Sequence, residues 1–123
     1  MKKKILVVDD EASLLKLTLL RLSISGYETF GAVDGQECLD LARREMPDLI
    51  VLDVLLPVMN GDEVAKILRK DKKLKHIPII LISAAIETLE AKARESGADG
   101  YLFKPFESKE LLGMIEKHLA AIV

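Results

Sequence analysis

Residues 4–11 read KILVVDDE, a short apolar run that ends in three carboxylates. The apolar residues 5–8 are mostly β-branched, which is typical of a short strand buried on both faces. Asp9, Asp10 and Glu11 follow this run without a spacer. Like charges repel one another at the end of a buried strand, so this junction is either a solvated surface loop or a site in which another group offsets the charge.

Similar apolar runs recur along the chain, and helical patterns separate them. We predict strands at residues 5–8, 28–32, 49–52, 77–82 and 100–103. All except the weaker second strand read as buried. We predict helices at residues 11–25, 35–45, 62–71, 86–96 and 107–122. The connections are too long for hairpins, so the pattern predicts an α/β fold, (βα)5, with a doubly wound five-stranded parallel sheet.

Several residues mark the expected ends of helices. Gly26 and Gly97 stand where C-terminal stops belong, and Pro47 separates the second helix from the third strand. Asp34, followed three residues later by Glu37, reads as an N-cap with a capping-box partner.

Length and composition indicate a single domain over residues 1–123. The 50% hydrophobic content and 31% charged content are those of a globular protein, and the net charge of −2 gives no general attraction to nucleic acid or to anionic membranes. The first apolar run is too short for an export signal or a membrane span. Cys38 is the single cysteine, so we expect a cytoplasmic protein without disulfides.

Polar residues follow four of the predicted strands directly: Asp9 and Asp10, Asp53, Ser83 and Lys104. The carboxyl ends of parallel strands share one edge of a sheet, so these side chains should lie close together. Carboxylate oxygens without nearby thiols suit Mg²⁺. A metal, a hydroxyl and an ammonium group can together neutralise a phosphoryl group. Asp53 is then either a third metal ligand or a nucleophile, and the two roles are compatible.

Four motifs at this edge together resemble the receiver domain of two-component response regulators, including the single-domain chemotaxis (CheY-like) type. They are Asp9-Asp10, the run DVLLPVMNG at 53–61, Ser83-Ala84-Ala85 and Lys104-Pro105-Phe106. The resemblance covers essentially the whole chain. It implies a flavodoxin-like sheet with strand order 2-1-3-4-5.

The resemblance also implies a role for each residue of the site. Asp53 would be the phosphoacceptor. Asp10 would bind Mg²⁺, or Mn²⁺ as a substitute, directly, whereas Asp9 would hold the metal largely through water. The backbone carbonyl of Leu55 would supply a further ligand. Lys104 would pair with the acceptor carboxylate and then with the phosphoryl oxygens.

A switch is implied as well. Ser83 would turn toward the phosphoryl group and Tyr101 would move inward behind it, although a plain core role for Tyr101 remains open. The peptide bond between Lys104 and Pro105 is expected to be cis. The face formed by the fifth strand and the last two helices would then change its affinity for a downstream target or an output domain.

The implied function is that of a phosphoacceptor regulatory domain, which assists its own phosphorylation and dephosphorylation but is not an enzyme. The phosphoryl donor would be a sensor histidine kinase or a histidine-phosphotransfer protein. Three alternatives remain: a small-molecule phosphohydrolase, a flavodoxin-like nucleotide carrier and a pseudo-receiver that only binds partners. The first lacks an evident general acid or base, and the second lacks a phosphate-binding loop.

The first helix is apolar on more than one side. Leu14, Thr18 and Leu22 form the expected core stripe, while Leu19 and Leu20 lie off it. These two leucines are either singly exposed or part of a docking surface for the phosphohistidine donor.

Three further residues have plain structural interpretations. Cys38 reads as a small buried residue of the second helix. His76 and His118 are expected to face solvent, without metal binding or phosphotransfer. The basic stretch 66–76 lacks interleaved aromatic residues and reads as a solvated face rather than a nucleic-acid site.

Overall fold

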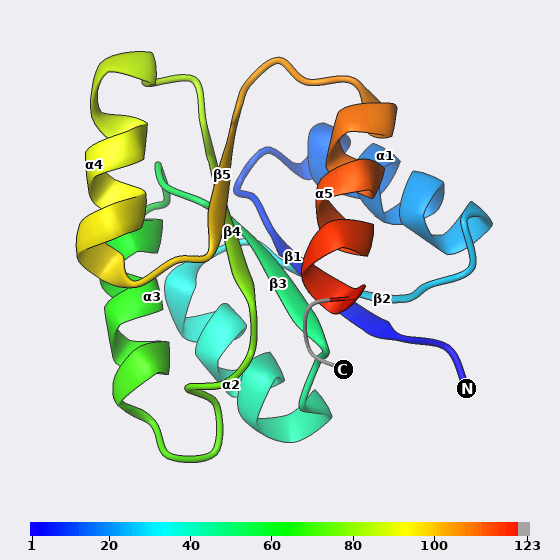
Figure 1. Cartoon of the computed structure of the whole chain (residues 1–123), viewed down its shortest axis with the longest axis horizontal. Coiled ribbons are helices and arrows are strands. Elements are labelled where there is room, and N and C mark those ends of the chain that lie inside the picture. The colour runs from blue at the N-terminus through cyan, green and yellow to red at the C-terminus, as the bar shows by residue number, and fades with distance from the viewer. Residues whose placement is uncertain (121–123) are drawn as a thin grey trace.

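The computed structural model describes residues 1–120, in which five strands and five helices alternate (Figure 1). The strands are β1 Lys4–Val8, β2 Glu28–Ala32, β3 Leu49–Asp53, β4 Ile79–Ser83 and β5 Gly100–Phe103. The helices are α1 Ala12–Ile24, α2 Gly35–Glu45, α3 Gly61–Lys70, α4 Ile86–Ser96 and α5 Ser108–Ala120. Residues 121 and 122, the end of the last predicted helix, lie outside the described residues.

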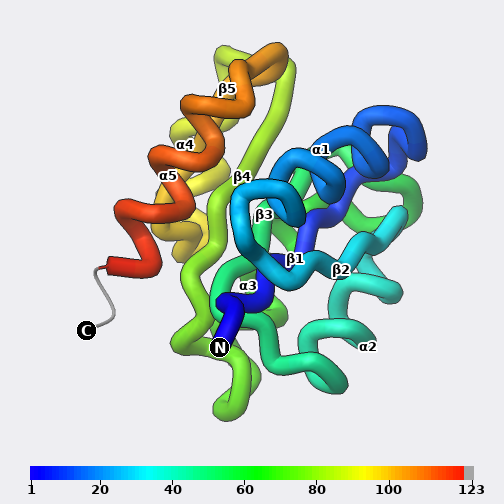
Figure 2. Tube along the Cα trace, turned by 90° about the vertical axis from the view of Figure 1, so that its right-hand side faces the viewer, coloured from blue at the N-terminus to red at the C-terminus, as the bar shows by residue number. Residues whose placement is uncertain are grey.

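The five strands form one parallel sheet in the order β2-β1-β3-β4-β5. Helices α1 and α5 cover one face, and α2, α3 and α4 cover the other (Figures 1 and 2). The predicted doubly wound α/β fold and its flavodoxin-like strand order are therefore confirmed.

The central strands β1, β3 and β4 are buried on both faces, because successive side chains point to opposite sides of the sheet. In β1, Leu6 and Val8 pack toward α2, α3 and α4, whereas Ile5 and Val7 pack toward α1 and α5. These strands are therefore fixed by two apolar layers, and their carboxyl ends emerge together at one edge of the sheet.

The prediction that the last strand is buried is wrong. In β5, Gly100, Tyr101 and Leu102 are half-buried and Phe103 is 38% exposed. The reason is its place at the edge of the sheet, where only β4 pairs with it.

Most helix ends follow the predicted signals. The Asp34 carboxylate accepts a hydrogen bond from the Glu37 N–H at 2.8 Å, which confirms the N-cap of α2. Gly26 and Gly97 have φ angles of 101° and 79°, as helix stops require. Strand β4 begins later than predicted, since the Ile77 N–H bonds back to the preceding turn, at the Leu74 carbonyl.

The predicted core stripe of α1 is wrong at one position. Leu15 is buried with Thr18 and Leu22, whereas Leu14 is half-buried. Leucines stand on several sides of this helix, so its apolar pattern does not define one rotation about the axis. Leu19 is half-buried and packs on the core, but Leu20 is 56% exposed.

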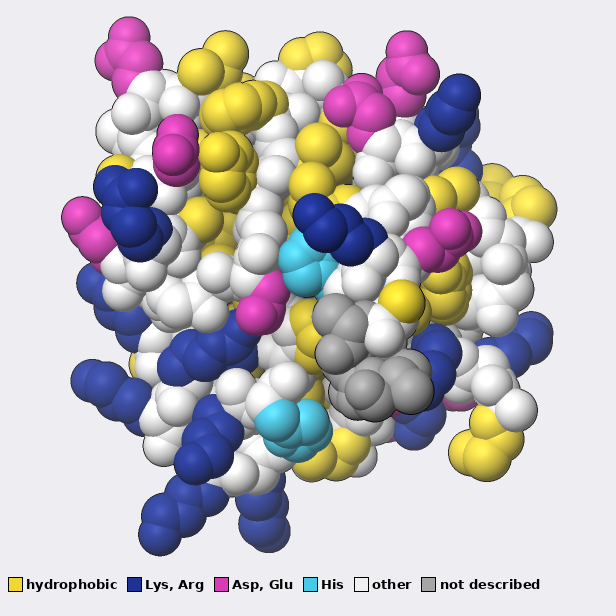
Figure 3. Space-filling view, viewed as in Figure 1, with side chains coloured by type: hydrophobic (Ala, Val, Ile, Leu, Met, Phe, Trp, Pro, Cys, Tyr) yellow, Lys and Arg dark blue, Asp and Glu magenta, His cyan; other side chains and the backbone are white. Residues whose placement is uncertain are grey.

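Acidic and basic residues are concentrated at opposite ends of four helices. Acidic residues occupy the first turns of α2 to α5 and basic residues occupy their last turns, as the helix dipole favours. Accordingly, Figure 3 shows acidic side chains toward the upper edge and mostly Lys and Arg side chains along the lower edge.

The remaining predictions concern single side chains. Cys38 is fully buried, as predicted, and burial raises the pKa of its thiol to about 12. His76 is exposed as predicted, but His118 is half-buried against β5, contrary to prediction.

Among the described residues, no helix combines the length and the apolar character needed to span a bilayer.

Candidate functional site

The predicted site residues stand at the carboxyl ends of four neighbouring strands. Asp53 and Ser83 are the last residues of β3 and β4, and Asp9 and Lys104 directly follow β1 and β5. The sheet ladder continues into the two residues beyond the strands. The Asp9 N–H donates to Ala32 at 3.0 Å, and the Lys104 N–H donates to Ser83 at 2.9 Å. Each functional side chain is thus placed by the backbone of the sheet.

Lys104 joins the two buried carboxylates of the site. Its Nζ donates to Asp53 Oδ2 at 2.6 Å and to Asp9 Oδ2 at 3.0 Å. The side chains of Asp53 and Asp9 are 6% and 3% exposed, so the ammonium group is their main source of compensating charge. The peptide bond from Lys104 to Pro105 is cis, as predicted.

Backbone amides two residues further along hold the other polar atoms. Asp9 Oδ1 accepts from the Glu11 N–H at 3.0 Å, and Asp53 Oδ1 accepts from the Leu55 N–H at 3.2 Å. The hydroxyl oxygen of Ser83 accepts from the Ala85 N–H at 3.0 Å. These local turns orient all three side chains.

Carboxylate oxygens of Asp9, Asp10 and Asp53 lie within 4.8 Å of one another, so this acidic cluster could hold a metal ion. Asp10 is exposed, whereas the other two are buried. Three carboxylates beside one ammonium group leave an excess of two negative charges, which a divalent cation matches. The donor set consists of hard oxygens, the ligands that Mg²⁺ and Mn²⁺ take.

The charges of the site perturb one another. Burial raises the pKa of the Asp53 carboxyl, against the hydrogen bond and charge of Lys104, and the charge of Asp9 raises it further. Burial alone would lower the pKa of the Lys104 ammonium, but the hydrogen bonds and charges of Asp53 and Asp9 raise it. Without a further cation, the Asp53 carboxyl therefore ionises less readily than a free aspartate.

Residues 5–116 match the family model of the response regulator receiver domain. The chain belongs to this family. It is 47% identical over 112 residues to PhoP, the alkaline phosphatase synthesis transcriptional regulatory protein of Bacillus subtilis, covering 90% of this chain and 46% of PhoP. It is 40% identical over 120 residues to the DNA-binding response regulator MtrA of Mycobacterium tuberculosis, covering 97% of this chain and 51% of MtrA.

The receiver domain thus spans about half the length of these curated relatives. Solved structures agree over nearly whole chains. The chemotaxis response regulator CheY4 of Vibrio cholerae superposes with a TM-score of 0.88 at 34% identity, covering 95% of this chain and 98% of that one. The Francisella response regulator 1452 receiver domain gives 0.89 at 31%, covering 99% and 100%. The chain is therefore a receiver domain of two-component signalling.

Gly61 is a structural residue of the receiver site to which the sequence analysis assigned no role. It begins α3, and its N–H donates to Val54 at 2.8 Å, which closes the loop after Asp53. A Cβ at this position would collide with the Asp53 carbonyl oxygen and would lie 2.8 Å from the carbonyl carbon. Since the obstacle is backbone, only glycine fits. Its place at the end of the 53–61 motif was the available signal.

The receiver fold does not bring every predicted site residue into the cluster. Ser83 lies at the same edge, but Tyr101 lies two residues before the end of β5, where its ring meets the edge of Phe103 at 5.7 Å between centroids. Leu55 contributes its N–H to Asp53. Its carbonyl as a metal ligand stays a prediction.

Proposed function

We propose that this receiver domain accepts a phosphoryl group on Asp53 from a phosphohistidine of a sensor histidine kinase or a histidine-phosphotransfer protein, and thereby switches a partner-binding surface. The observation that carries this proposal is the bridge from Lys104 to Asp53 and Asp9 beside an acidic cluster with excess negative charge. The bridge fixes the acceptor oxygens, and the excess charge favours a divalent cation.

The proposed transfer exchanges one bond to phosphorus for another. A carboxylate oxygen of Asp53 forms a bond to phosphorus, the bond from phosphorus to the donor imidazole nitrogen breaks, and that nitrogen retains the electron pair. Hydrolysis later returns the carboxylate and releases inorganic phosphate, as water attacks phosphorus. Lys104 would pair first with the Asp53 carboxylate and then with the phosphoryl oxygens. This is the charge stabilisation that such transfers require.

Mg²⁺, with Mn²⁺ as a substitute, is the proposed cofactor, and it would supply electrostatic stabilisation of the phosphoryl oxygens. Asp10 and one oxygen of Asp53 would bind it directly, together with the Leu55 carbonyl. The two oxygens of Asp9 already accept hydrogen bonds from Lys104 and from the Glu11 N–H. Asp9 would hold the metal largely through water, as the family resemblance implies.

We further propose that residues 1–123 form one receiver domain with a regulatory rather than an enzymatic role, in which the protein assists its own phosphorylation and dephosphorylation. The regulatory character of the family supports this. The cytoplasm is the proposed compartment, supported by the buried single thiol of Cys38. Direct binding of nucleic acid or membrane is not part of the proposal.

The donor would dock beside α1. A hollow of about 300 Å³ extends from Lys104 and Ala84 to Leu14 and Phe106, and an adjoining one of about 320 Å³ continues from Leu14 to Leu17. Leu17 and Leu20 are 46% and 56% exposed on the same helix. The hypothesis that α1 docks the donor therefore drops Leu19, which packs inward, keeps Leu20 and adds Leu17.

Leu20→Glu tests this docking surface. We expect transfer from the phosphohistidine donor to slow by about tenfold or more, as for an interface anchor, while phosphorylation by acetyl phosphate stays unchanged. Ile67→Glu, at a leucine-sized exposed position on α3 across the sheet, is the matched control. Equal donor-dependent rates for both variants would rule out docking at α1.

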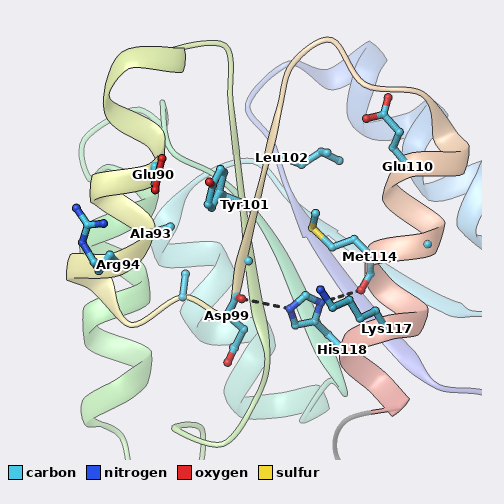
Figure 4. Close-up of a pocket in the computed structure, with 13 residues that line it drawn as sticks. Glu90, Ala93, Arg94, Asp99, Tyr101, Leu102, Glu110, Met114, Lys117 and His118 are labelled. Atoms are coloured by element: carbon cyan, nitrogen blue, oxygen red, sulfur yellow. Dashed lines mark hydrogen bonds between the residues drawn. The ribbon is translucent and has the colours of Figure 1, made fainter.

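The output surface would be the face formed by α4, β5 and α5. It contains a groove of about 650 Å³, with Tyr101 on its floor and α4 and α5 as its walls (Figure 4). Movement of Ser83 toward the phosphoryl group, followed by inward movement of Tyr101, would change the shape of this groove. A downstream target or an output domain would read the change.

Intact-mass measurement with acetyl phosphate and Mg²⁺ tests the proposed function. We expect one phosphoryl adduct, absent in Asp53→Asn and absent when a chelator removes the metal. An adduct that persists in Asp53→Asn would place the acceptor elsewhere. Failure to form an adduct with either acetyl phosphate or a phosphohistidine donor would favour the pseudo-receiver.

A further inference from the structure

Arg69, in the last turn of α3, uses all three guanidinium nitrogens to hold neighbouring segments. Its Nε donates to the Gly97 carbonyl at 2.8 Å, and its Nη1 donates to the carbonyls of Ile77 at 2.7 Å and Lys75 at 3.1 Å. Its Nη2 donates to the Asp99 carboxylate at 2.6 Å. The side chain is only 21% exposed. The Asp99 side chain is 42% exposed, so it is the set of four hydrogen bonds from one planar group, rather than the ion pair alone, that fastens the two connections to α3.

Asp99 connects Arg69 to the sheet. The oxygen that accepts from Arg69 also accepts from the Ile79 N–H at 2.8 Å. The Asp99 N–H donates to the Ile79 carbonyl at 2.9 Å. The connection between α4 and β5 is therefore tied to α3 and to the first residue of β4, through both side chain and backbone.

His118 extends the attachment to α5, across the lower end of the groove (Figure 4). Its Nε2 lies 3.2 Å from the Asp99 carbonyl oxygen, and its Nδ1 lies 2.8 Å from the Met114 carbonyl oxygen. A neutral imidazole carries one N–H, so the tautomer protonated on Nε2 is the one that donates to Asp99. The ring also covers Gly100, where an added Cβ would lie 3.1 Å from the imidazole Cε1. The imidazole thus spans the space between α5 and the start of β5.

The upper end of the groove has no comparable connection. Glu90, Tyr101 and Glu110 line it, and within residues 1–120 no hydrogen bond or ion pair joins these three side chains to one another. One end of the groove is therefore fastened by side-chain polar contacts, whereas at the other end no such contact joins Glu90, Tyr101 and Glu110 within residues 1–120.

We propose that Arg69, Asp99 and His118 form a clasp, which makes the connection from α4 to β5 and the C-terminal half of α5 open and close as one unit. Arg69 is then a positioning residue for the groove. It lies near the opposite end of α3 from Gly61, about 12 Å along the helix axis at 1.5 Å per residue. For signalling, which rests on the proposed function, the clasp confines rearrangement of the groove to its upper end.

Native-state hydrogen exchange of the unmodified protein tests the clasp. In Arg69→Met, amide exchange should accelerate by about tenfold or more at residues 97–101, since hydrogen bonds of a charged group are lost. The same acceleration should appear at residues 115–118 of α5, which Arg69 does not touch. Arg94→Met is the matched control, because within residues 1–120 the Arg94 side chain makes no hydrogen bond or ion pair.

His118→Phe separates the clasp from a local role of Arg69, since it keeps a ring over Gly100 but removes the contact with Asp99. It should accelerate exchange at residues 97–101, and the double variant with Arg69→Met should add little at α5. Acceleration confined to residues 97–101 in Arg69→Met, or none there in His118→Phe, would overturn the clasp. The second test decides the matter if Arg69→Met fails to fold.

This experiment needs neither metal nor phosphodonor. A chain that fails to take up a phosphoryl group would therefore refute the proposed function without affecting the result for the clasp. In the phosphorylated protein, exchange should change at residues 84–90 but stay constant at residues 97–100.

Discussion

Gly61→Ala should displace the backbone of Asp53, the proposed phosphoacceptor. The added Cβ would collide with the carbonyl oxygen of Asp53 and would lie 2.8 Å from the carbonyl carbon and 3.1 Å from the Val54 Cα. None of these atoms belongs to a flexible side chain, so α3 or the end of β3 must move. Overpacking of this kind costs about 1–3 kcal/mol. The displaced Asp53 would also lose its alignment with Lys104.

The expected loss in free energy of unfolding is therefore about 2 kcal/mol, measured by denaturant titration, with a slower formation of the adduct from acetyl phosphate. Gly113→Ala on α5 is the matched control, since a Cβ there meets nothing within 4 Å. This variant should gain about 0.5–1 kcal/mol, because alanine favours a helix more than glycine does. If Gly61→Ala were as stable and as readily phosphorylated as Gly113→Ala, the assigned role of Gly61 would be wrong.

Three further predictions concern charge and reactivity. Because the folded-state pKa of Asp53 is raised, its ionisation destabilises the fold, and stability falls as pH rises from the ordinary value of 3.8 through the folded value. Asp53→Asn removes this titration, so denaturant titrations in chelator should show a smaller fall in stability from acidic to neutral pH for the variant than for the wild type. Added Mg²⁺ should raise the denaturation midpoint of the wild type, but much less that of Asp10→Asn, and equal shifts would exclude Asp10 as a ligand. Cys38, with its pKa near 12 and no exposure, should react with iodoacetamide at pH 8 only after unfolding, and rapid labelling of the native protein would contradict its burial.

The sequence was sufficient to predict the fold and the residues at the carboxyl edge of the sheet. Short β-branched runs determine the central strands, and the polar residue after each run marks the carboxyl edge. Asp9, Asp53, Ser83 and Lys104 could be placed there because they lie at most one residue from a strand end. The cis bond before Pro105 was available only through the resemblance to a family.

Other features depend on the rotation and packing of elements, which local patterns do not specify. α1 carries leucines on several sides, so a small rotation of the helix about its axis buries Leu15 in place of Leu14. The half-buried position of His118 depends on α5 lying beside Gly100, and the steric role of Gly61 depends on α3 meeting the backbone of β3. Both contacts join residues whose separation in sequence gives no periodic signal.

The bridge of Lys104 to Asp9 spans 95 positions of the chain. During synthesis the carboxylates leave the ribosome first, and their ammonium partner follows only after β5 has been made. A nascent chain that stops before β5 holds the acidic residues without the cation that offsets them. The proposed competence to accept a phosphoryl group should therefore arise only after β5 joins the sheet, so the site depends on complete assembly of the sheet.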